Sequence, residues 1–274
     1  MNPLAPLPAS LAGAARLVLL TAEPAAKCAV SHRFAGAWWS GAIPEVGQAA
    51  MPARPARPIR PVLLPPRDMT RRRTGGLRGR IALLHAIAHI ELNAVDLAWD
   101  IVGRFTHAAM PRAFFDDWVA VADDEARHFD LLAQRLAVLG ASYGDLPAHD
   151  GLWQSAQRTA HDLLARLAVV PLVLEARGLD VTPTMAASLR ATGDADSAAV
   201  LDVIYREEIG HVAAGRRWFE ALCASRGLDP AIAFRDLVLQ HHSAPPKPPF
   251  NHAARAEAGL LPAFYEIPPQ SIGR

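Results

Sequence analysis

Apolar residues recur at three- and four-residue steps through most of the chain beyond residue 76, and this spacing predicts amphipathic helices. In the first such segment Ile81, Leu84 and Ala88 fall on one helical face. Four long helices are predicted, over Leu77–Phe105, Pro111–Leu139, Leu152–Arg177 and about Ser197–Ser225. No alternating pattern typical of strands persists in the sequence, so the expected fold class is all-α.

Proline and glycine residues indicate where these helices begin, end or bend. Pro111 suits the first turn of the second helix, and Gly140 suits its end. Pro171 predicts a distortion inside the third helix, and Gly178 predicts a stop or a kink there. Further helical pieces are predicted over Pro8–Thr21, from Glu23-Pro24 onward, over Thr184–Arg190 and over Ala231–His241.

The distribution of proline and arginine divides the chain into four segments. Between residues 51 and 76 prolines recur so often that helix and central strand are excluded, which predicts an extended arm. The expected segments are an N-terminal helical segment packing on the bundle (1–50), the Pro/Arg-rich arm (51–76), a four-helix bundle (77–242) and an irregular wrapping tail (243–274).

Two Glu-x-x-His motifs carry the clearest chemical signal. Glu125-Ala-Arg-His128 lies on the second predicted helix, and Glu208-Ile-Gly-His211 lies on the fourth. Residues three positions apart share a helical face, so each motif presents a carboxylate and an imidazole at one point. With ten glutamates and eleven histidines in 274 residues, chance supplies about 0.4 such matches, so a pair of them is informative.

A lone glutamate precedes each motif by nearly the same distance. Glu91 lies 34 residues before Glu125, and Glu175 lies 33 residues before Glu208. Predicted breaks fall near the middle of both intervals, so each pair of helices can fold back and bring the glutamate level with its motif. The 50 residues between Glu125 and Glu175 leave room for a crossover connection. We therefore predict a ferritin-like four-helix bundle built on a duplicated half-site.

The predicted metal ligands are four carboxylates and two imidazoles. Bundles that bind two iron or two manganese ions use this set, and its oxygen-rich character suits either metal. A single glutamate or histidine on a helix more often faces solvent, but these six have apolar neighbours, where an ionised group is costly unless it is coordinated or paired. The expected ligands of two iron (or manganese) ions are Glu91, Glu125, His128, Glu175, Glu208 and His211.

Several segments resemble the ferritin-like family named "domain of unknown function 455". They are His85–Leu97, Asp124–Phe129, Leu174–Asp180, Glu207–Val212 and the tail motifs Pro248-Pro-Phe-Asn251, Ala254-Arg255 and Ala258-Gly259. The resemblance spans about residues 10–265 and implies a ferritin-like fold and metal binding, but no particular reaction. A more distant likeness to bacterial non-haem di-iron tRNA hydroxylases is limited to the ligand pattern, and one fold hosts many chemistries.

The ligand set makes a non-haem di-iron oxidoreductase, hydroxylase- or oxidase-like, the expected function. Its partners would be dioxygen or peroxide and a small-molecule or RNA substrate. Tyr205, three residues before Glu208 on the same face, is the candidate catalytic residue as an electron or proton relay, with a packed tyrosine as the alternative. Two other functions stay open: metal or peroxide handling without an organic substrate, and a metal-braced helical module that binds RNA or protein.

Charge is uneven along the chain. Between residues 51 and 80 there are nine arginines and one acid, Asp68, whereas the whole chain has a net charge of +1. Such a run could bind an RNA backbone, but no aromatic residue interleaves the arginines to stack on bases. We favour the interpretation in which the arm lies on the acidic surface of the bundle and pairs with its carboxylates.

The cysteine content and the lengths of the apolar runs indicate where in the cell the protein is expected. Two isolated cysteines, Cys28 and Cys223, make no disulfide framework and favour a cytoplasmic location. No continuous apolar run reaches the roughly 20 residues of a membrane span, so no membrane is expected. The oligomeric state is open, with a homodimer as one option. His85 and His89 are expected to be packed or surface histidines, and Asp96 and Asp180 are expected to orient histidines or arginines.

Overall fold

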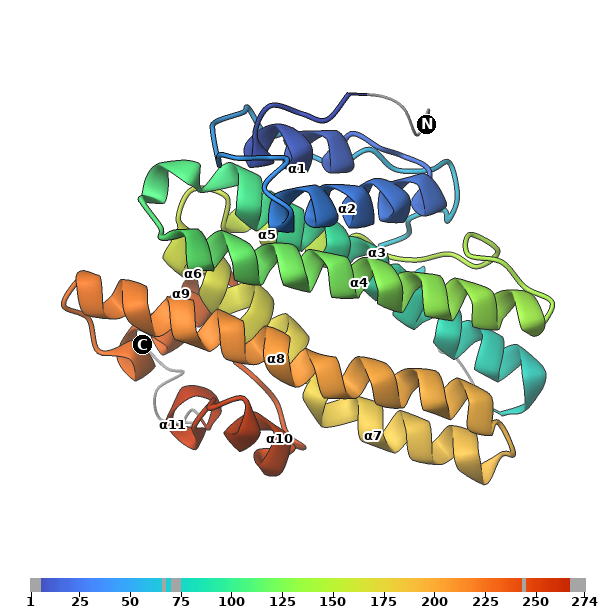
Figure 1. Cartoon of the computed structure of the whole chain (residues 1–274). Coiled ribbons are helices and arrows are strands. Elements are labelled where there is room, and N and C mark those ends of the chain that lie inside the picture. Colours follow the sequence, from blue (N-terminus) through green and yellow to red (C-terminus); the bar gives the residue numbers. More distant parts are fainter. Residues whose placement is uncertain (1–5, 66–67, 70–74, 243–244, 267–274) are drawn as a thin grey trace. The chain divides into compact units, whose positions relative to one another are not determined.

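The computed structural model describes residues 6–65, 68–69, 75–242 and 245–266 (Figure 1). Its described residues form helices and loops, with one isolated β-bridge, between Leu63 and Ala148, and no β-strand. The predicted all-α class is therefore confirmed. The chain divides into two compact units, Met1–Gln154 and Ser155–Arg274.

Unit 1 is built on two long helices, α3 (Gly76–Arg104) and α4 (Arg112–Val138). A short 3-10 turn, η2 (Thr106–Ala108), joins them, so the two helices run antiparallel and pack along their length (Figure 1). Pro111 caps α4 at its N-terminus, and Gly140 follows its C-terminus with a positive φ of 76°. The predicted limits of the first two long helices are confirmed.

Two shorter helices of unit 1 pack on this pair: α1 (Leu11–Leu19) on α3, and α2 (Pro24–Trp39) on α4. The Glu23 carboxylate accepts hydrogen bonds from the first backbone N–H groups of α2, as an N-cap should. Ser31 of α2 links three helices, because its hydroxyl donates to the Ala122 carbonyl and accepts from the Trp99 indole. Trp38, Trp99 and Trp118 are fully buried and fill the core of the unit.

The arm of unit 1 has no helix between residues 51 and 65, which agrees with the prediction of an extended segment. Backbone hydrogen bonds fix it at two places. Ala56 N–H donates to the Leu19 carbonyl (2.7 Å), and Leu64 N–H donates to the Ala148 carbonyl (2.8 Å). The cluster Arg71, Arg72 and Arg73 lies outside the described residues.

In the described part of unit 2, seven helical segments follow α5 (Gly151–Arg158), which spans the boundary between the units. They are α6 (Leu163–Val169), η3 (Val170–Glu175), α7 (Ala176–Ala191), α8 (Ala195–Ser225), α9 (Pro230–His241) and the two short tail helices α10 (His252–Glu257) and α11 (Pro262–Tyr265). The helices α7 and α8 form an antiparallel pair (Figure 1). Phe219, Phe234 and Phe264 make edge-on ring contacts that join α8, α9 and α11.

The third predicted helix, Leu152–Arg177, is wrong as one continuous element. It breaks at residues 159–162, where the buried Arg166 donates to the Thr159 hydroxyl (2.9 Å) and to the Ala156 carbonyl (2.7 Å). Asp162 then caps α6. Gly178 does not stop the helix, since α7 runs through it to Ala191 and includes the separately predicted Thr184–Arg190 piece.

The distortion predicted at Pro171 is confirmed. Val170–Glu175 is a π-helical turn, which accommodates a proline that has no N–H to give to a regular helix. This turn lies very close to α8, because a Cβ built on Gly215 would be 2.3 Å from the Pro171 Cβ. Only glycine at that position allows the approach, and the turn ends on Glu175.

The tail of unit 2 is more ordered than predicted, since it contains α10 and α11 instead of only irregular chain. The Arg255 guanidinium is buried and makes two hydrogen bonds with the Asp180 carboxylate, at 2.8 and 2.7 Å. The Phe250 and Tyr265 rings pack on it. Asn251 donates to the Leu179 carbonyl (3.1 Å), so the tail is fastened to α7.

Within the described residues, α3 is the one helix that is long and apolar enough to cross a membrane. Of its most apolar 18-residue window, 67% is buried inside the protein. The same window includes buried ionisable side chains, among them His89 and Glu91. The apolar residues of α3 are thus mostly buried against the rest of the protein.

Candidate metal centre

Three of the predicted ligands meet in the core of unit 1. Glu91 comes from α3, and Glu125 and His128 come from consecutive turns of α4. The His128 Nδ1 atom lies 3.2 Å from Glu91 Oε2 and 3.5 Å from Glu125 Oε2. All three side chains are buried, and their donor atoms lie within 4.8 Å of one another. We call these three residues the unit 1 half-site.

The surroundings of the unit 1 half-site are apolar, as the sequence predicted. Ala88, Leu92 and Val95, which flank Glu91 on α3, are at most 1% exposed. Ala122 and Ala126, one turn before and one residue after Glu125, are fully buried. Their small side chains let α3 and α4 approach closely, and together these residues keep water away from the carboxylates.

Burial and proximity perturb the protonation of these groups. Burial raises the pKa of Glu91 well above its ordinary value, and the Glu125 carboxylate raises it further. Burial by itself lowers the pKa of His128, but hydrogen bonds and charges from Glu125 and Glu91 outweigh it and raise that pKa to about 11. The two carboxylates therefore compete for the one positive charge that His128 can supply.

This donor set fits a metal cation. Two buried carboxylates and one imidazole bring oxygen and nitrogen donors together in an apolar core, where the negative charge of an ionised carboxylate is costly unless it is coordinated or paired. A cation bound by the carboxylates would compensate it and would leave His128 neutral, as a metal ligand must be. The structure supports a buried glutamate and histidine cluster able to hold a metal ion, without identifying the metal.

The equivalent residues of unit 2 are arranged less tightly. Glu208 and His211 are buried on α8, with His211 Nδ1 3.7 Å from Glu208 Oε2. Glu175 is the last residue of the π-helical turn and is half-buried. Within unit 2 these donors do not gather as a group of three within 4.8 Å in the part of the chain that the structure describes. We call Glu175, Glu208 and His211 the unit 2 half-site.

Tyr205, the predicted relay, packs against the tail of unit 2. Its side chain is partly exposed, and its hydroxyl accepts a hydrogen bond from the Asn251 amide at 3.0 Å. Asn251 N–H in turn donates to the Asp180 carboxylate at 2.9 Å. Tyr205 therefore packs against the tail and helps to fasten it, which agrees with the alternative prediction of a packed tyrosine.

The two histidines before Glu91 hold a loop of unit 1. His85 Nε2 accepts a hydrogen bond from Gly144 N–H at 2.9 Å, and its ring stacks on that of Tyr143. His89 Nδ1 lies 2.9 Å from the Tyr143 hydroxyl, and burial lowers the pKa of His89 to about 4. Both are packed core residues, as expected, and they fix residues 143–149 against α3.

The buried partners of Asp96 in unit 1 were not identified from the sequence. The Lys27 ammonium contacts the Asp96 carboxylate, and both side chains are at most 2% exposed. Arg57 of the arm lies 3.6 Å from the same carboxylate and donates to the Asn93 amide oxygen at 2.6 Å. Arg54 pairs with Asp150. These contacts agree with the interpretation of an arm that lies on the protein and pairs with its acids.

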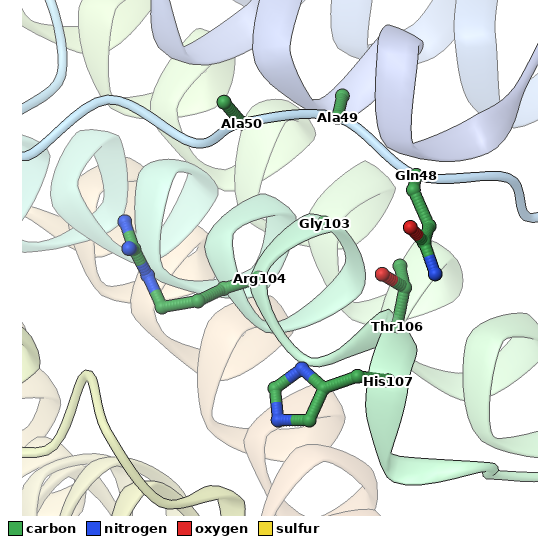
Figure 2. A pocket seen from close by; sticks show the side chains of 7 residues that line it. All are labelled: Gln48, Ala49, Ala50, Gly103, Arg104, Thr106 and His107. Carbon is green, nitrogen blue, oxygen red and sulfur yellow. The ribbon is translucent and has the colours of Figure 1, made fainter.

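A shallow pocket of about 440 Å³ lies at the C-terminal end of α3 (Figure 2). It is lined by Gln48, Ala49, Ala50, Gly103, Arg104, Thr106 and His107. Its one permanent cation, Arg104, is already neutralised, because its guanidinium makes hydrogen bonds of 2.7–2.9 Å with the Asp100 carboxylate. This pocket does not include any of the predicted ligands.

Comparison with known proteins gives the family. Residues 20–266 match the family described as "Protein of unknown function (DUF455)". An "Uncharacterized protein" of Haemophilus influenzae (strain ATCC 51907 / DSM 11121 / KW20 / Rd) is 42% identical over 215 residues, which are 75% of each chain. No solved structure matches the chain. The family match includes both half-sites and the tail motif that fastens to α7. The chain belongs to the DUF455 family.

Proposed function

We propose that the protein is a ferritin-like four-helix bundle whose two half-sites bind two iron or manganese ions. We further propose that it works as an oxygen-dependent oxidoreductase, hydroxylase- or oxidase-like. The observation that carries the proposal is the buried cluster of Glu91, Glu125 and His128, whose donor atoms lie within 4.8 Å of one another in an apolar core. The repetition of the same residue types at a 33-residue interval, ending at Glu208 and His211, supports a second metal position.

The roles of the protein groups follow from their placement. The carboxylates of Glu91 and Glu125 would bind metal and are free to change their mode of coordination, since neither is part of a helix cap. His128 would bind through one ring nitrogen. The apolar shell of α3 and α4 would exclude bulk water, which strengthens charge interactions inside the site. When bound, an iron or manganese pair supplies the capacity to activate dioxygen or peroxide.

Metal analysis of the purified full-length protein tests the first part. We expect about two iron or manganese ions per chain, and a loss of at least half of them in Glu125→Ala. Asp124→Asn is the matched control, because Asp124 is adjacent but pairs with Arg127 at 2.7 Å on a partly exposed surface. Equal metal content in wild type and Glu125→Ala, with both folded by circular dichroism, would refute the metal centre.

Reaction with oxygen separates the enzymatic proposal from its alternatives. Absorption changes and oxygen uptake on mixing the reduced, metal-loaded protein with dioxygen would support an oxidoreductase. Rapid peroxide dismutation, or assembly into a cage that stores metal, would instead favour metal or peroxide handling. A metal-loaded protein inert toward both oxidants, but with a lower melting temperature after metal removal, would indicate a metal-braced module.

A further inference from the structure

A second pocket of unit 1, of about 520 Å³, lies between the start of α2, the arm and α4. Its lining is mainly apolar and comes from Glu23, Pro24, Ala25, Pro58, Ile59, Arg60, Phe129, Ala133 and Tyr143. The volume is in the range of sites for small organic molecules, about 300–1,000 Å³. The unit 1 half-site residues are not among its lining residues, so a function for this pocket is independent of the proposed metal chemistry.

Two aromatic rings form one wall of the pocket, and the protein holds both in place. The rings of Phe129 and Tyr143 meet edge to face, with centroids 5.2 Å apart. His85 stacks on Tyr143, and the Tyr143 hydroxyl is tied inward to His89. This wall is therefore preorganised and would lose little conformational entropy when a flat ring packs against it.

The arm segment Pro58–Arg60 also lines the pocket. Backbone hydrogen bonds at Ala56 and at Leu64 hold the arm on both sides of this segment, so its position is defined by the fold. Ile59 is 98% exposed, which is unusual for a large aliphatic side chain on a fixed segment at the edge of an apolar pocket. A bound molecule would cover it.

The charged side chains that line the pocket favour a negatively charged ligand. The exposed Arg60 guanidinium makes no ion pair or hydrogen bond within the described part of the chain, unlike Arg54 and Arg57 of the same arm. Both oxygens of the Glu23 carboxylate are used by the N-terminus of α2, at 3.1 and 2.6 Å, and the helix dipole offsets its charge. The pocket therefore offers one cation that has no partner among the described residues, Arg60, and one carboxylate whose oxygens already accept hydrogen bonds from the backbone.

We propose that this pocket binds a small aromatic carboxylate, with its ring against Phe129 and Tyr143 and its carboxylate on Arg60. The arm would then act as the closing wall of a ligand site, in addition to packing on unit 1. The ligand would bind reversibly, and no covalent bond would form or break.

Binding of 2-naphthoate to the full-length protein tests it, measured by calorimetry and by methyl NMR of labelled isoleucine. We expect saturable binding, a shift of the Ile59 methyl signals, and about tenfold weaker binding in Arg60→Gln, since a charge-assisted hydrogen bond is lost. The neutral 2-naphthamide and the non-aromatic cyclohexanecarboxylate should each bind at least fivefold more weakly than 2-naphthoate.

Arg54→Gln is the matched control, because it removes the same charge from the same arm at a residue that pairs with Asp150 and does not line the pocket. Its affinity for 2-naphthoate should equal that of wild type. Equal weakening by both substitutions, equal affinity for the amide, or unshifted Ile59 methyl signals at saturation would each overturn the proposal. Ala133→Trp, which fills the pocket, should abolish binding, and circular dichroism would verify that it folds.

Discussion

The close approach of the π-helical turn to α8 can be tested with a single methyl group. In Gly215→Ala the added Cβ would lie 2.3 Å from the Cβ and 2.5 Å from the Cγ of Pro171. Carbon atoms do not approach within 3.0 Å, and the proline ring cannot rotate away, so the turn or α8 must shift. Overpacking of this kind costs about 1–3 kcal/mol.

A second glycine of α8 isolates this cost from helix propensity. Alanine is favoured over glycine inside a helix by about 0.5–1 kcal/mol, and that gain applies to both Gly215→Ala and Gly210→Ala. Gly210 is exposed and has no atom within 4 Å of a built Cβ. Gly210→Ala should therefore raise the free energy of unfolding above that of wild type. The free energy of unfolding of Gly215→Ala should be about 1–3 kcal/mol lower than that of Gly210→Ala.

Urea unfolding followed by circular dichroism at the helix band measures the difference between the two variants. The m-values should agree, so that the difference is one of stability. Equal unfolding free energies for the two variants would refute the argument and would mean that the π-helical turn can withdraw from α8 without cost. A second expected result concerns metal content: because Glu175 ends this turn, Gly215→Ala should bind less metal than Gly210→Ala.

Two further predictions concern ion pairs. Asp180→Asn leaves the buried Arg255 guanidinium without its partner charge. We expect a loss of about 3–5 kcal/mol in unfolding free energy and faster proteolysis of the tail. A protease-resistant tail in this variant would contradict the role given to the Arg255–Asp180 pair in fastening the tail. His32 lies 2.6 Å from Asp123, and hydrogen bonds to Asp123 and Asp130 raise its pKa to about 9. Since the folded pKa exceeds the ordinary value of 6.5, this stabilisation is complete below about pH 6.5 and is lost as pH rises through 9. The melting temperature of wild type should therefore exceed that of His32→Gln at pH 6 and converge with it near pH 10; a constant difference would show that His32 acts by packing alone.

The helix pairs and the buried glutamate and histidine cluster of unit 1 were predictable because they depend on local signals. Periodic apolar residues define α3 and α4, and a Glu-x-x-His motif places Glu125 and His128 on one face whatever the surrounding fold. Glu91 followed from its distance to Glu125. Gly140 ends α4 as predicted, since an exposed glycine after an apolar run has no competing tertiary contact.

The features that sequence reasoning missed depend on partners distant in the chain. Asp96 and Asp180 were expected to orient histidines or arginines, but Lys27 and Asp96 are 69 residues apart and Arg255 and Asp180 are 75 apart, so no local signal identifies either partner. The break before α6 depends on a buried Arg166, a residue type expected at the surface. Gly178 stays helical because packing of α7 on α8 and on the tail outweighs the low helix propensity of glycine.

The fastening of the tail to α7 has a consequence for the order in which the protein matures. Asn251 and Arg255 make hydrogen bonds with Leu179 and Asp180 of α7, one turn beyond Glu175. The ribosome adds Asn251 and Arg255 to the chain some 75 residues after these partners. A nascent chain can therefore complete its first glutamate and histidine cluster while the second still lacks its support. Premature stop codons before Asn251 should produce molecules whose N-terminal half accepts metal and whose C-terminal half holds it poorly.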